Sequence, residues 1–242
     1  MREPELEGQT VVLIGGSAGI GLETARRAKA EGAAVILTGR DSGRLKAAAH
    51  ELDLDTDRTA AFDATDTAAV REFFEGLSRL DHVLVTAGGP HYRPLLEMDA
   101  DAVRLAISDH IVMALDVARN AAPKMRPGGS ILLMGGTGGR RIRPGIMSAA
   151  TAVLPPFTAS LALEIAPVRV NLIAAGFVDT PLSASLLGGK LEDRREELRR
   201  TLPIGRVVGP ADVAALAVHL MTNTALTGAT YDIDGGQQFV GA

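Results

Sequence analysis

Short apolar segments alternate with longer helical segments along the whole chain. The apolar segments are rich in β-branched residues and bounded by glycine or polar residues, which is typical of strands buried on both faces. The clearest of them cover residues 10–14, 34–38, 82–86, 130–134 and 168–173, with 59–62 and 230–233 as weaker candidates. The segments between them have helical spacing and predict helices over roughly 19–31, 41–52, 66–78, 97–124, 147–166 and 210–221.

This alternation predicts an α/β fold. We expect one domain over residues 1–242, built as a doubly wound parallel sheet of about seven strands with helices on both faces. Right-handed crossovers make such a sheet doubly wound, and doubly wound sheets bind ligands at the carboxyl ends of their strands.

The stretch 183–202 interrupts the alternation of predicted strands and helices. It contains Gly188-Gly189, followed by a run of charged residues over 190–200. Charge pairs at helical spacing favour a solvated helix. Its place in the chain also suits a substrate lid, with the two glycines as the hinge. The two interpretations are compatible.

Composition narrows the class of protein. The hydrophobic content of 46% suffices for a sizeable core, and the absence of cysteine excludes disulfides, a thiolate nucleophile and cysteine metal sites. A net charge of −4 argues against binding nucleic acid or an anionic membrane.

The start of the chain is acidic and lacks the apolar core of a secretory signal, and no apolar run approaches the ~18–20 residues of a membrane helix. We therefore expect a soluble, cytoplasmic protein that acts on a small molecule. The histidines His50, His82 and His219 lack metal-ligand spacing, so no metal site is expected.

A glycine-rich loop follows the first predicted strand. It reads Gly15-Gly-Ser-Ala-Gly19-Ile-Gly21 and opens the first predicted helix. Glycines allow a tight turn and a close approach of the backbone to a pyrophosphate, which the helix N-terminus attracts through its free N–H groups and dipole. A merely structural glycine turn is the alternative. The position between the first strand and the first helix favours a dinucleotide site.

The residue after the second strand bears on which dinucleotide binds. An acidic residue there accepts a hydrogen bond from the ribose 2′-hydroxyl of NAD, whereas arginine accommodates the 2′-phosphate of NADP. The strand ends without an acid and Arg40 follows, which favours NADP(H) over NAD(H). Asp41 is adjacent and Arg40 can also simply be solvated, so this preference stays an expectation.

The chain resembles the short-chain dehydrogenase/reductase family over nearly its whole length. The family's Thr-Gly-x-x-x-Gly-x-Gly appears as Ile14 followed by the glycine loop, and its Asn-Asn-Ala-Gly appears as Val85-Thr-Ala-Gly88. The segments 164–171, 175–180 and 226–236 are also close to family patterns. The resemblance implies a Rossmann-like fold, an NAD(P)-dependent oxidoreductase, and a homodimer or homotetramer.

The resemblance also implies cofactor contacts along the carboxyl edge of the sheet. Asp63 would meet the adenine, and Thr180 would hydrogen-bond the nicotinamide carboxamide. The complete expected set is Gly15, Ser17, Gly19, Ile20, Gly21, Arg40, Asp63, Ala64, Ala87, Gly88, Gly89, Gly176, Val178 and Thr180.

The four positions that carry the family's chemistry are all substituted. The ungapped run over 148–164 sets the register, which places Met147 at the catalytic tyrosine and Thr151 at the lysine. His110 stands at the asparagine and Gly136 at the serine. Methionine cannot donate a proton, and threonine cannot lower a neighbour's pKa by charge. The family's proton relay for an ordinary ketone is therefore not expected.

Three residues are candidates to replace that relay. His110 can supply a proton, although a helix histidine with a purely structural contact is the alternative. Tyr92, in the loop after the fourth strand, is a second acid candidate, although a loop tyrosine can simply pack. Thr137 has a hydroxyl close to the lost serine and can orient a substrate oxygen.

Substrate contacts are expected after the fifth strand. Arg140, Arg141 and Arg143 can clamp a carboxylate or phosphate, or be solvated, or pair at an oligomer interface. Met147, at the tyrosine position, is expected to contact substrate, although the stretch from Met147 to Ala162 as a whole is best interpreted as packing. A cationic electrophile such as an iminium, or an activated alkene, would not need the missing tyrosine. We expect an NADP(H)-dependent oxidoreductase with non-standard proton handling. The alternatives are an inactive nucleotide-binding sensor or partner subunit, and a non-redox enzyme on the same fold.

Overall fold

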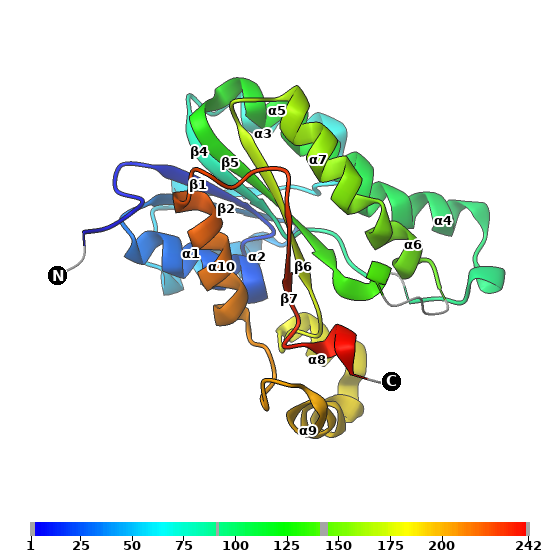
Figure 1. Cartoon of the computed structure of the whole chain (residues 1–242). Helices are drawn as coiled ribbons and strands as arrows, with labels where there is room; N and C mark the ends of the chain where they lie inside the picture. The colour runs from blue at the N-terminus through cyan, green and yellow to red at the C-terminus, as the bar shows by residue number, and fades with distance from the viewer. Residues whose placement is uncertain (1–2, 91, 141–144, 241–242) are drawn as a thin grey trace.

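Seven parallel strands form one sheet in the computed structural model of the chain, which describes residues 3–90, 92–140 and 145–240 (Figure 1). The strands are β1 (Thr10–Ile14), β2 (Ala34–Gly39), β3 (Thr59–Ala61), β4 (Leu80–Val85), β5 (Met125–Gly136), β6 (Arg169–Ala175) and β7 (Thr230–Ile233). Their order is β3-β2-β1-β4-β5-β6-β7. The predicted doubly wound sheet is therefore confirmed, and its strand order reverses between β1 and β4, where such folds bind ligands.

Helices cover both faces of the sheet, and each layer buries its own apolar core (Figure 1). One layer holds α1 (Gly19–Ala30), α2 (Ser42–Glu51) and α10 (Pro210–Thr222). The other holds α3 (Thr67–Glu75), α5 (Met113–Ala121) and α7 (Leu154–Glu164). Alternate residues of β1 divide between the layers: Val11 and Leu13 pack in the first core, and Val12 and Ile14 pack in the second. This two-sided burial explains why the strands are almost continuously apolar.

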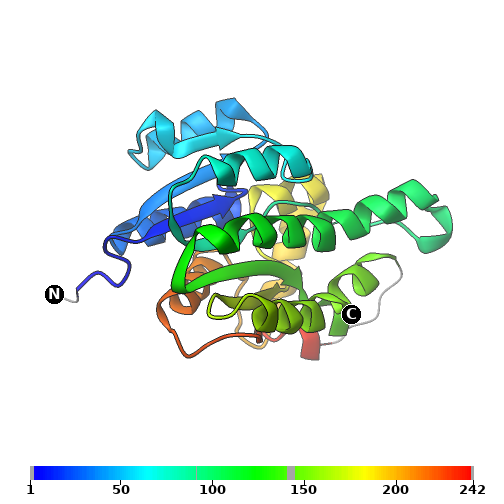
Figure 2. The ribbon, with the colours of Figure 1, turned by 90° about the horizontal axis from the view of Figure 1, so that it is seen from above.

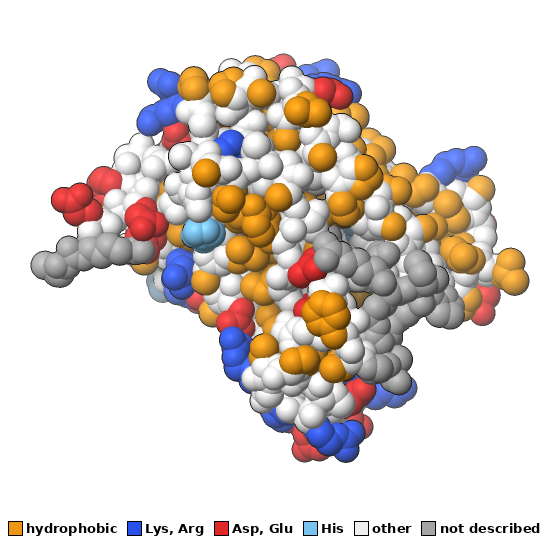
Figure 3. Space-filling view, viewed as in Figure 1, with side chains coloured by type: hydrophobic (Ala, Val, Ile, Leu, Met, Phe, Trp, Pro, Cys, Tyr) orange, Lys and Arg blue, Asp and Glu red, His pale blue; other side chains and the backbone are white. Residues whose placement is uncertain are grey.

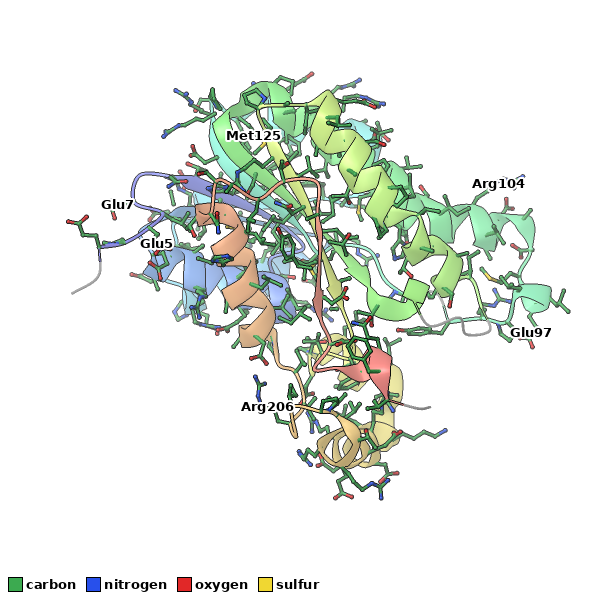
Figure 4. All side chains as sticks on the ribbon, in the orientation of Figure 1. Glu5, Glu7, Glu97, Arg104, Met125 and Arg206 are labelled. Carbon is green, nitrogen blue, oxygen red and sulfur yellow. The ribbon has the colours of Figure 1, made fainter. Side chains whose placement is uncertain are left out.

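The helix predicted over 97–124 is interrupted in the structure. After a short 3-10 turn, Leu95–Glu97, come α4 (Ala100–Ile107), a π-helical turn over Ser108–Val112, and α5. Asp99 caps α4 by accepting a hydrogen bond from the Ala102 N–H at 2.8 Å. Figure 2 shows α4 continuing α5 beyond the end of the sheet, and Figure 4 shows Glu97 and Arg104 on this projecting part.

The helix predicted over 147–166 is also divided. It consists of α6 (Met147–Ala152) and α7, with Pro155 and Pro156 in the first turn of α7. Proline is tolerated there because the first N–H groups of a helix have no partner within the helix. One helix therefore ends before Val153 and a new helix begins after it, which places both prolines in a first turn.

The segment 181–201, which we call the lid segment, lies beyond the carboxyl ends of β6 and β7 (Figure 1). It contains α8 (Pro181–Leu187), a 3-10 turn (Gly188–Lys190) and α9 (Leu191–Thr201). Gly188 has a φ of +52°, which favours glycine. The predicted charged helix is confirmed, and the role of the segment as a lid stays a prediction.

A buried arginine joins the opposite end of the sheet to α10. The Arg169 guanidinium donates to the carbonyls of Leu220 and Met221 at 2.7 Å each, at the C-terminus of that helix. This satisfies carbonyls that the helix cannot pair itself and places a cation at the negative end of its dipole. Arg169 therefore supports the scaffold, far along β6 from the carboxyl edge. No helix in the described parts of the chain is both long enough and apolar enough to span a membrane.

Candidate nucleotide-binding site

The glycine-rich loop lies where β1 and β4 meet at the carboxyl edge of the sheet. Gly15 has a φ of +100°, and a Cβ added to it would lie 2.6 Å from Thr86 Oγ1 and 2.8 Å from Ala87 N. A Cβ on Gly21 would overlap the Gly15 carbonyl oxygen. The Thr86 hydroxyl donates to that same oxygen at 3.0 Å. Gly15 and Gly21 are thus required by the turn itself, whatever the loop binds.

The start of α1 is open to an anion. As the structure describes this helix, no side chain caps its N-terminus, because the N-cap residue is Ala18, and its first turn has no acidic residue. Gly19 has a φ of +54°, and a Cβ added to it would lie 3.5 Å from the Thr180 side chain. Unpaired N–H groups and the positive end of the helix dipole therefore face the space between the glycine loop and the loop after β6.

A cavity of about 360 Å³ extends from this loop past the ends of β2 and β4. Its volume is in the range of small-molecule sites. Its lining includes six of the expected cofactor residues, Gly15, Ser17, Arg40, Ala64, Ala87 and Gly88. It also includes Thr38, Gly39, Asp41, Arg44 and Phe62.

Two arginines stand at the end of β2 beside this cavity. Arg40 is largely exposed, with 81% of its side-chain surface accessible, and Arg44 also lines the cavity. The neighbouring Asp41 is committed to α2, because its carboxylate accepts a hydrogen bond from the Arg44 N–H at 3.0 Å. That hydrogen bond is the main cause of the lowered pKa of Asp41. Sequence reasoning missed Arg44, although its place in the first turn of the predicted helix put it one turn from Arg40.

Asp63, which follows β3, lies near Arg40. Its Oδ1 accepts hydrogen bonds from the Thr65 N–H at 2.9 Å and the Thr65 hydroxyl at 2.8 Å. Its Oδ2 is 4.0 Å from Arg40 Nη1. The hydrogen bond from the Thr65 backbone is the largest cause of the lowered pKa of Asp63, to which Arg40 adds by its charge. The carboxylate is thus held charged and oriented.

The loop after β6 comes back to the glycine loop. Val178 pairs with Val208 in an isolated parallel bridge. Thr180 is the N-cap of α8, where it forms a capping box with Ser183. A Cβ on Gly176 would lie 2.6 Å from Asp234 Cβ, so the C-terminal turn also requires glycine there. The structure therefore brings Gly176, Val178 and Thr180 to one edge of the sheet.

The positions that we expect to correspond to the family's serine, tyrosine and lysine lie together at the carboxyl end of β5 and on α6. The Thr151 hydroxyl donates to the Met147 carbonyl at 2.7 Å. A Cβ built on Gly136 would lie 3.7 Å from Thr151 Cγ2. Thr151 is only 5% exposed. Because its proton is used within α6, its hydroxyl is not a free donor to a substrate.

His110 occupies the π-helical turn between α4 and α5. Its Nδ1–H donates to the Ala106 carbonyl at 3.0 Å. Since the carbonyl can only accept, the neutral ring has its second nitrogen, Nε2, unprotonated, and only the doubly protonated ring can donate from Nε2. A Cβ on Gly88 would lie 2.9 Å from the Asp109 carbonyl oxygen, so this turn packs against the end of β4. Single π-turns are frequent at functional sites.

Of the remaining predicted residues, Thr137 lies beside α6, since a Cβ on Gly138 in the same turn would lie 3.7 Å from Thr151 Oγ1, whereas Tyr92 is exposed in a separate loop. Thr137 is 7% exposed within a 3-10 helix, Thr137–Arg140, and Tyr92 is 72% exposed in the loop after β4. The loops after β4 and β5 do meet, because a Cβ on Gly145 would lie 3.0 Å from the Arg93 carbonyl oxygen. Arg141 and Arg143 lie outside the described residues, and of Arg140 only the backbone is described.

Comparisons with known proteins agree with this geometry. A family model described as enoyl-(acyl carrier protein) reductase matches residues 15–238. A short-chain dehydrogenase/reductase of Stachybotrys chlorohalonatus is 27% identical over 252 residues, which cover 96% of this chain and 98% of that protein. The cyclic-di-GMP-binding biofilm dispersal mediator protein of Escherichia coli is 32% identical over 236 residues, covering 94% of this chain and 96% of that protein. The crystal structure of L-sorbose reductase from Gluconobacter frateurii, complexed with NADPH and L-sorbose, is 25% identical. Its TM-score is 0.89, with 98% of this chain and 99% of that chain covered.

Proposed function

The chain belongs to the short-chain dehydrogenase/reductase family, and on that premise we propose that it is an NADP(H)-dependent oxidoreductase whose proton handling departs from the family's. The observation that carries the proposal is the cavity at the switch point of the sheet, with Arg40 and Arg44 at one end and the uncapped start of α1 beside it. The solved NADPH complex of a family member supports the choice of cofactor.

We infer that residues along the carboxyl edge of the sheet would contact each part of such a cofactor. The pyrophosphate would rest on the N–H groups at the start of α1. The 2′-phosphate would lie between Arg40 and Arg44, since Asp41 is committed to capping α2. Asp63 would meet the adenine, and Thr180 the nicotinamide carboxamide. The cofactor supplies the hydride, so the protein has to orient the substrate and handle the proton.

Proton handling determines the class of substrate. Met147 has no acidic proton, and the Thr151 proton is held by the Met147 carbonyl. The strongest candidate left at this end of the sheet is Nε2 of His110, and only in the doubly protonated ring. Such a site suits an electrophile that is already activated, such as an iminium ion or an activated alkene. A substrate with a carboxylate or phosphate would be held by the arginines at 140, 141 and 143.

A second candidate is a nucleotide-binding protein without catalysis. The loss of the family's tyrosine and lysine favours it, because no charged side chain replaces either at Met147 and Thr151. The Escherichia coli relative, named for binding a cyclic dinucleotide, also favours it. This candidate predicts cofactor binding without turnover of any imine, enone or ketone.

We further propose that the chain forms a homodimer or homotetramer. Exposed apolar side chains lie on α4, on the π-turn that follows it, and on and beside α7, where Figure 3 shows apolar surface along α7 and α4. They are Leu105, Ile107, Val112, Val153 and Leu163. Extended apolar patches on soluble proteins mark association surfaces. Light scattering of the purified protein tests this, and a monomer at micromolar concentration would contradict it.

The test of the proposed function is a calorimetric titration of the protein with NADPH and NADH side by side. We expect NADPH to bind and NADH to bind at least 10-fold more weakly, a difference of about 1.4 kcal/mol. Turnover is then measured on imines, enones and ketones. Failure to bind either cofactor would overturn the proposal, and binding without turnover of any of these substrates would select the non-catalytic candidate.

A further inference from the structure

Helix α9 is tied to the loop before α8 by an ion pair of good geometry. Arg195 donates from Nε to Asp179 Oδ2 at 2.9 Å and from Nη2 to Asp179 Oδ1 at 2.8 Å. Each of the two side chains is 30% exposed. Two parallel hydrogen bonds on a partly sheltered carboxylate make this pair stronger than an ordinary surface ion pair. Because the two residues are 16 apart in the chain, the ion pair closes residues 179–195 into a loop that contains α8 and the start of α9.

Neighbouring charges hold Arg195 in this orientation. Its Nη1 donates to Glu192 at 3.1 Å, and Arg199 donates to the other oxygen of Glu192 at 2.9 Å. The hydrogen bond from Arg199 is the largest cause of the lowered pKa of Glu192, which keeps that carboxylate charged. All three charged residues lie on α9. Glu192 therefore helps to hold the Arg195 guanidinium in the orientation in which it contacts Asp179.

Asp179 stands between two residues of the proposed cofactor site. Its N–H donates to the Val208 carbonyl at 2.9 Å, which extends the bridge made by Val178. The next residue, Thr180, is the N-cap of α8 and lies beside Gly19 of the glycine loop. The Asp179 side chain is therefore attached to the backbone one residue before Thr180.

The lid segment is packed at its C-terminal end and has open space around its central glycines. Leu198 of α9 and Leu202 just after it are buried, and a Cβ on Gly235 would lie 2.8 Å from Ile204 Cδ1, so the chain after α9 packs against the C-terminal turn. A Cβ on Gly188 or Gly189 would meet nothing within 4 Å among the described atoms. The Asp179–Arg195 pair therefore links the packed helix α9 to the start of α8 by a contact other than this open turn.

We propose that the Asp179–Arg195 ion pair couples the order of the lid segment to the cofactor contact of Thr180, which makes Arg195 a positioning residue. The inference rests on the proposed binding of NADP(H) at Thr180. When the pair is closed, α8 and α9 form one unit that holds Thr180 against the glycine loop. Because coupling between two sites is reciprocal, a bound cofactor stabilises the lid segment by the same factor by which the closed lid strengthens cofactor binding.

The test compares hydrogen–deuterium exchange of the lid segment in the full-length protein, with and without NADPH. Exchange is read on peptic peptides, so removal of an arginine does not alter the cleavage sites. In the unsubstituted protein we expect NADPH to slow exchange over 181–201 by about 10-fold. Arg195→Gln should speed exchange without cofactor, abolish most of the protection by NADPH, and weaken NADPH binding by about 10-fold. Asp179→Asn and the double variant should behave like Arg195→Gln, because the second substitution removes nothing further.

The matched control is Arg200→Gln, which removes a cation of the same helix and leaves in place the hydrogen bonds of Arg195 to Asp179 and Glu192. Arg195→Lys keeps the charge without the bidentate contact, and its exchange should be intermediate between those of Arg195→Gln and the unsubstituted protein. The proposal is overturned if Arg195→Gln and Arg200→Gln exchange alike, or if NADPH protects the Arg195→Gln variant fully. If the unsubstituted protein binds no NADPH, the proposed function and the coupling both fail. The exchange of the cofactor-free variants then shows separately whether the ion pair orders α9.

Discussion

Thr151 donates its hydroxyl to the carbonyl of Met147 at 2.7 Å, one turn earlier in α6. From the register of the run over 148–164, we expect these two positions to correspond to the lysine and the tyrosine of the family's proton relay. Here they make a contact between a side chain and the backbone that any helix can make. The backbone that would carry the relay is intact, since α6 still packs beside the end of β5 at Gly136. On this register, we expect the side chains of the relay to be absent while the backbone that would carry them remains.

Restoring the relay should therefore restore its activity. The triple variant Gly136→Ser, Met147→Tyr, Thr151→Lys is expected to gain NADPH-dependent reduction of a simple ketone by at least about 10²-fold over the unsubstituted protein. A serine fits at position 136, where an added Cβ has its nearest neighbour at 3.6 Å. The rate of NADPH oxidation with a ketone, followed by absorbance, measures the gain.

Met147→Tyr alone is the control, because a tyrosine without the neighbouring lysine keeps a pKa too high for efficient proton transfer at neutral pH. It should gain much less than the triple variant. A triple variant that folds, binds NADPH and reduces no ketone would contradict the assignment of these three positions.

His110 is expected to carry the proton transfer in the unsubstituted protein. Its Nδ1–H is held by the Ala106 carbonyl, so Nε2 of the protonated ring is its free donor. His110→Ala should lower turnover of the best substrate by about 10²-fold with little change in NADPH affinity. His219→Ala, on α10 away from the site, is the control. An unchanged rate in His110→Ala would remove this residue from the mechanism.

Arg40 and Arg44 are expected to set the preference for NADPH. Replacing either by alanine should weaken NADPH binding by about 10-fold while leaving NADH binding unchanged, because only NADPH carries the 2′-phosphate that the guanidinium would meet. Calorimetric titration with both cofactors measures the ratio. Arg26→Ala removes one positive charge on α1, where Arg26 pairs with Glu23 and Glu51 away from the cavity, and should alter neither affinity. Equal losses for NADPH and NADH would indicate general electrostatics and contradict phosphate recognition.

Sequence patterns predicted the sheet well because strand and helix periodicity are local properties. The bounds of β1 and β7 agree with the prediction, and α10 extends only one residue beyond it. The π-turn around His110 was missed, since an extra residue in a helix depends on what packs against it, here the backbone of Gly88.

Sequence motifs predicted only part of the candidate site. Motif positions located the glycine loop and Thr180, but not the closeness of Gly19 to Thr180 that joins them. The pairing of Arg195 with Asp179 was also invisible, because it depends on how α9 folds back onto the loop after β6. The features that the sequence did not predict are contacts between segments far apart in the chain, which residue types alone do not reveal.

His82 should make the stability of the fold depend on pH. It is 2% exposed, with Nδ1 2.8 Å from Ser130 Oγ and Nε2 2.7 Å from Gln9 Oε1. Burial is the main cause that lowers the pKa of His82 to about 3, with a smaller effect from the charge of Arg169. An unfolded histidine binds its proton near pH 6.5, so between about pH 6.5 and 3 the unfolded state binds more protons than the folded one. The stability from this residue is therefore complete above about pH 6.5 and is lost as the pH falls toward 3.

Between pH 7 and pH 4.5 this loss should amount to about 2–3 kcal/mol. Urea unfolding of the unsubstituted protein and of His82→Gln, at both pH values, separates the contribution of His82 to the free energy of unfolding from that of the titrating carboxylates. The difference in unfolding free energy between the two proteins should shrink by that amount at the lower pH. His50→Gln, at an exposed position of α2, should show no such change. Parallel pH dependences of the unsubstituted protein and His82→Gln would mean that His82 is protonated in the folded state.

Thr158 on α7 offers a way to stabilise the protein. It is fully buried, and its hydroxyl has no hydrogen-bond partner among the described residues. Thr158→Val keeps the shape of the side chain and removes the unpaired polar group, so the free energy of unfolding should rise by about 1 kcal/mol and the melting temperature by about 2–4 °C. Thr24→Val is the matched control, since Thr24 is equally buried in α1 but donates to the Ile20 carbonyl at 2.8 Å. That substitution should not stabilise the protein, because it discards a satisfied hydrogen bond. Thermal unfolding of both variants decides the matter: a loss of stability in Thr158→Val as large as that in Thr24→Val would show that the Thr158 hydroxyl is paired in the folded protein.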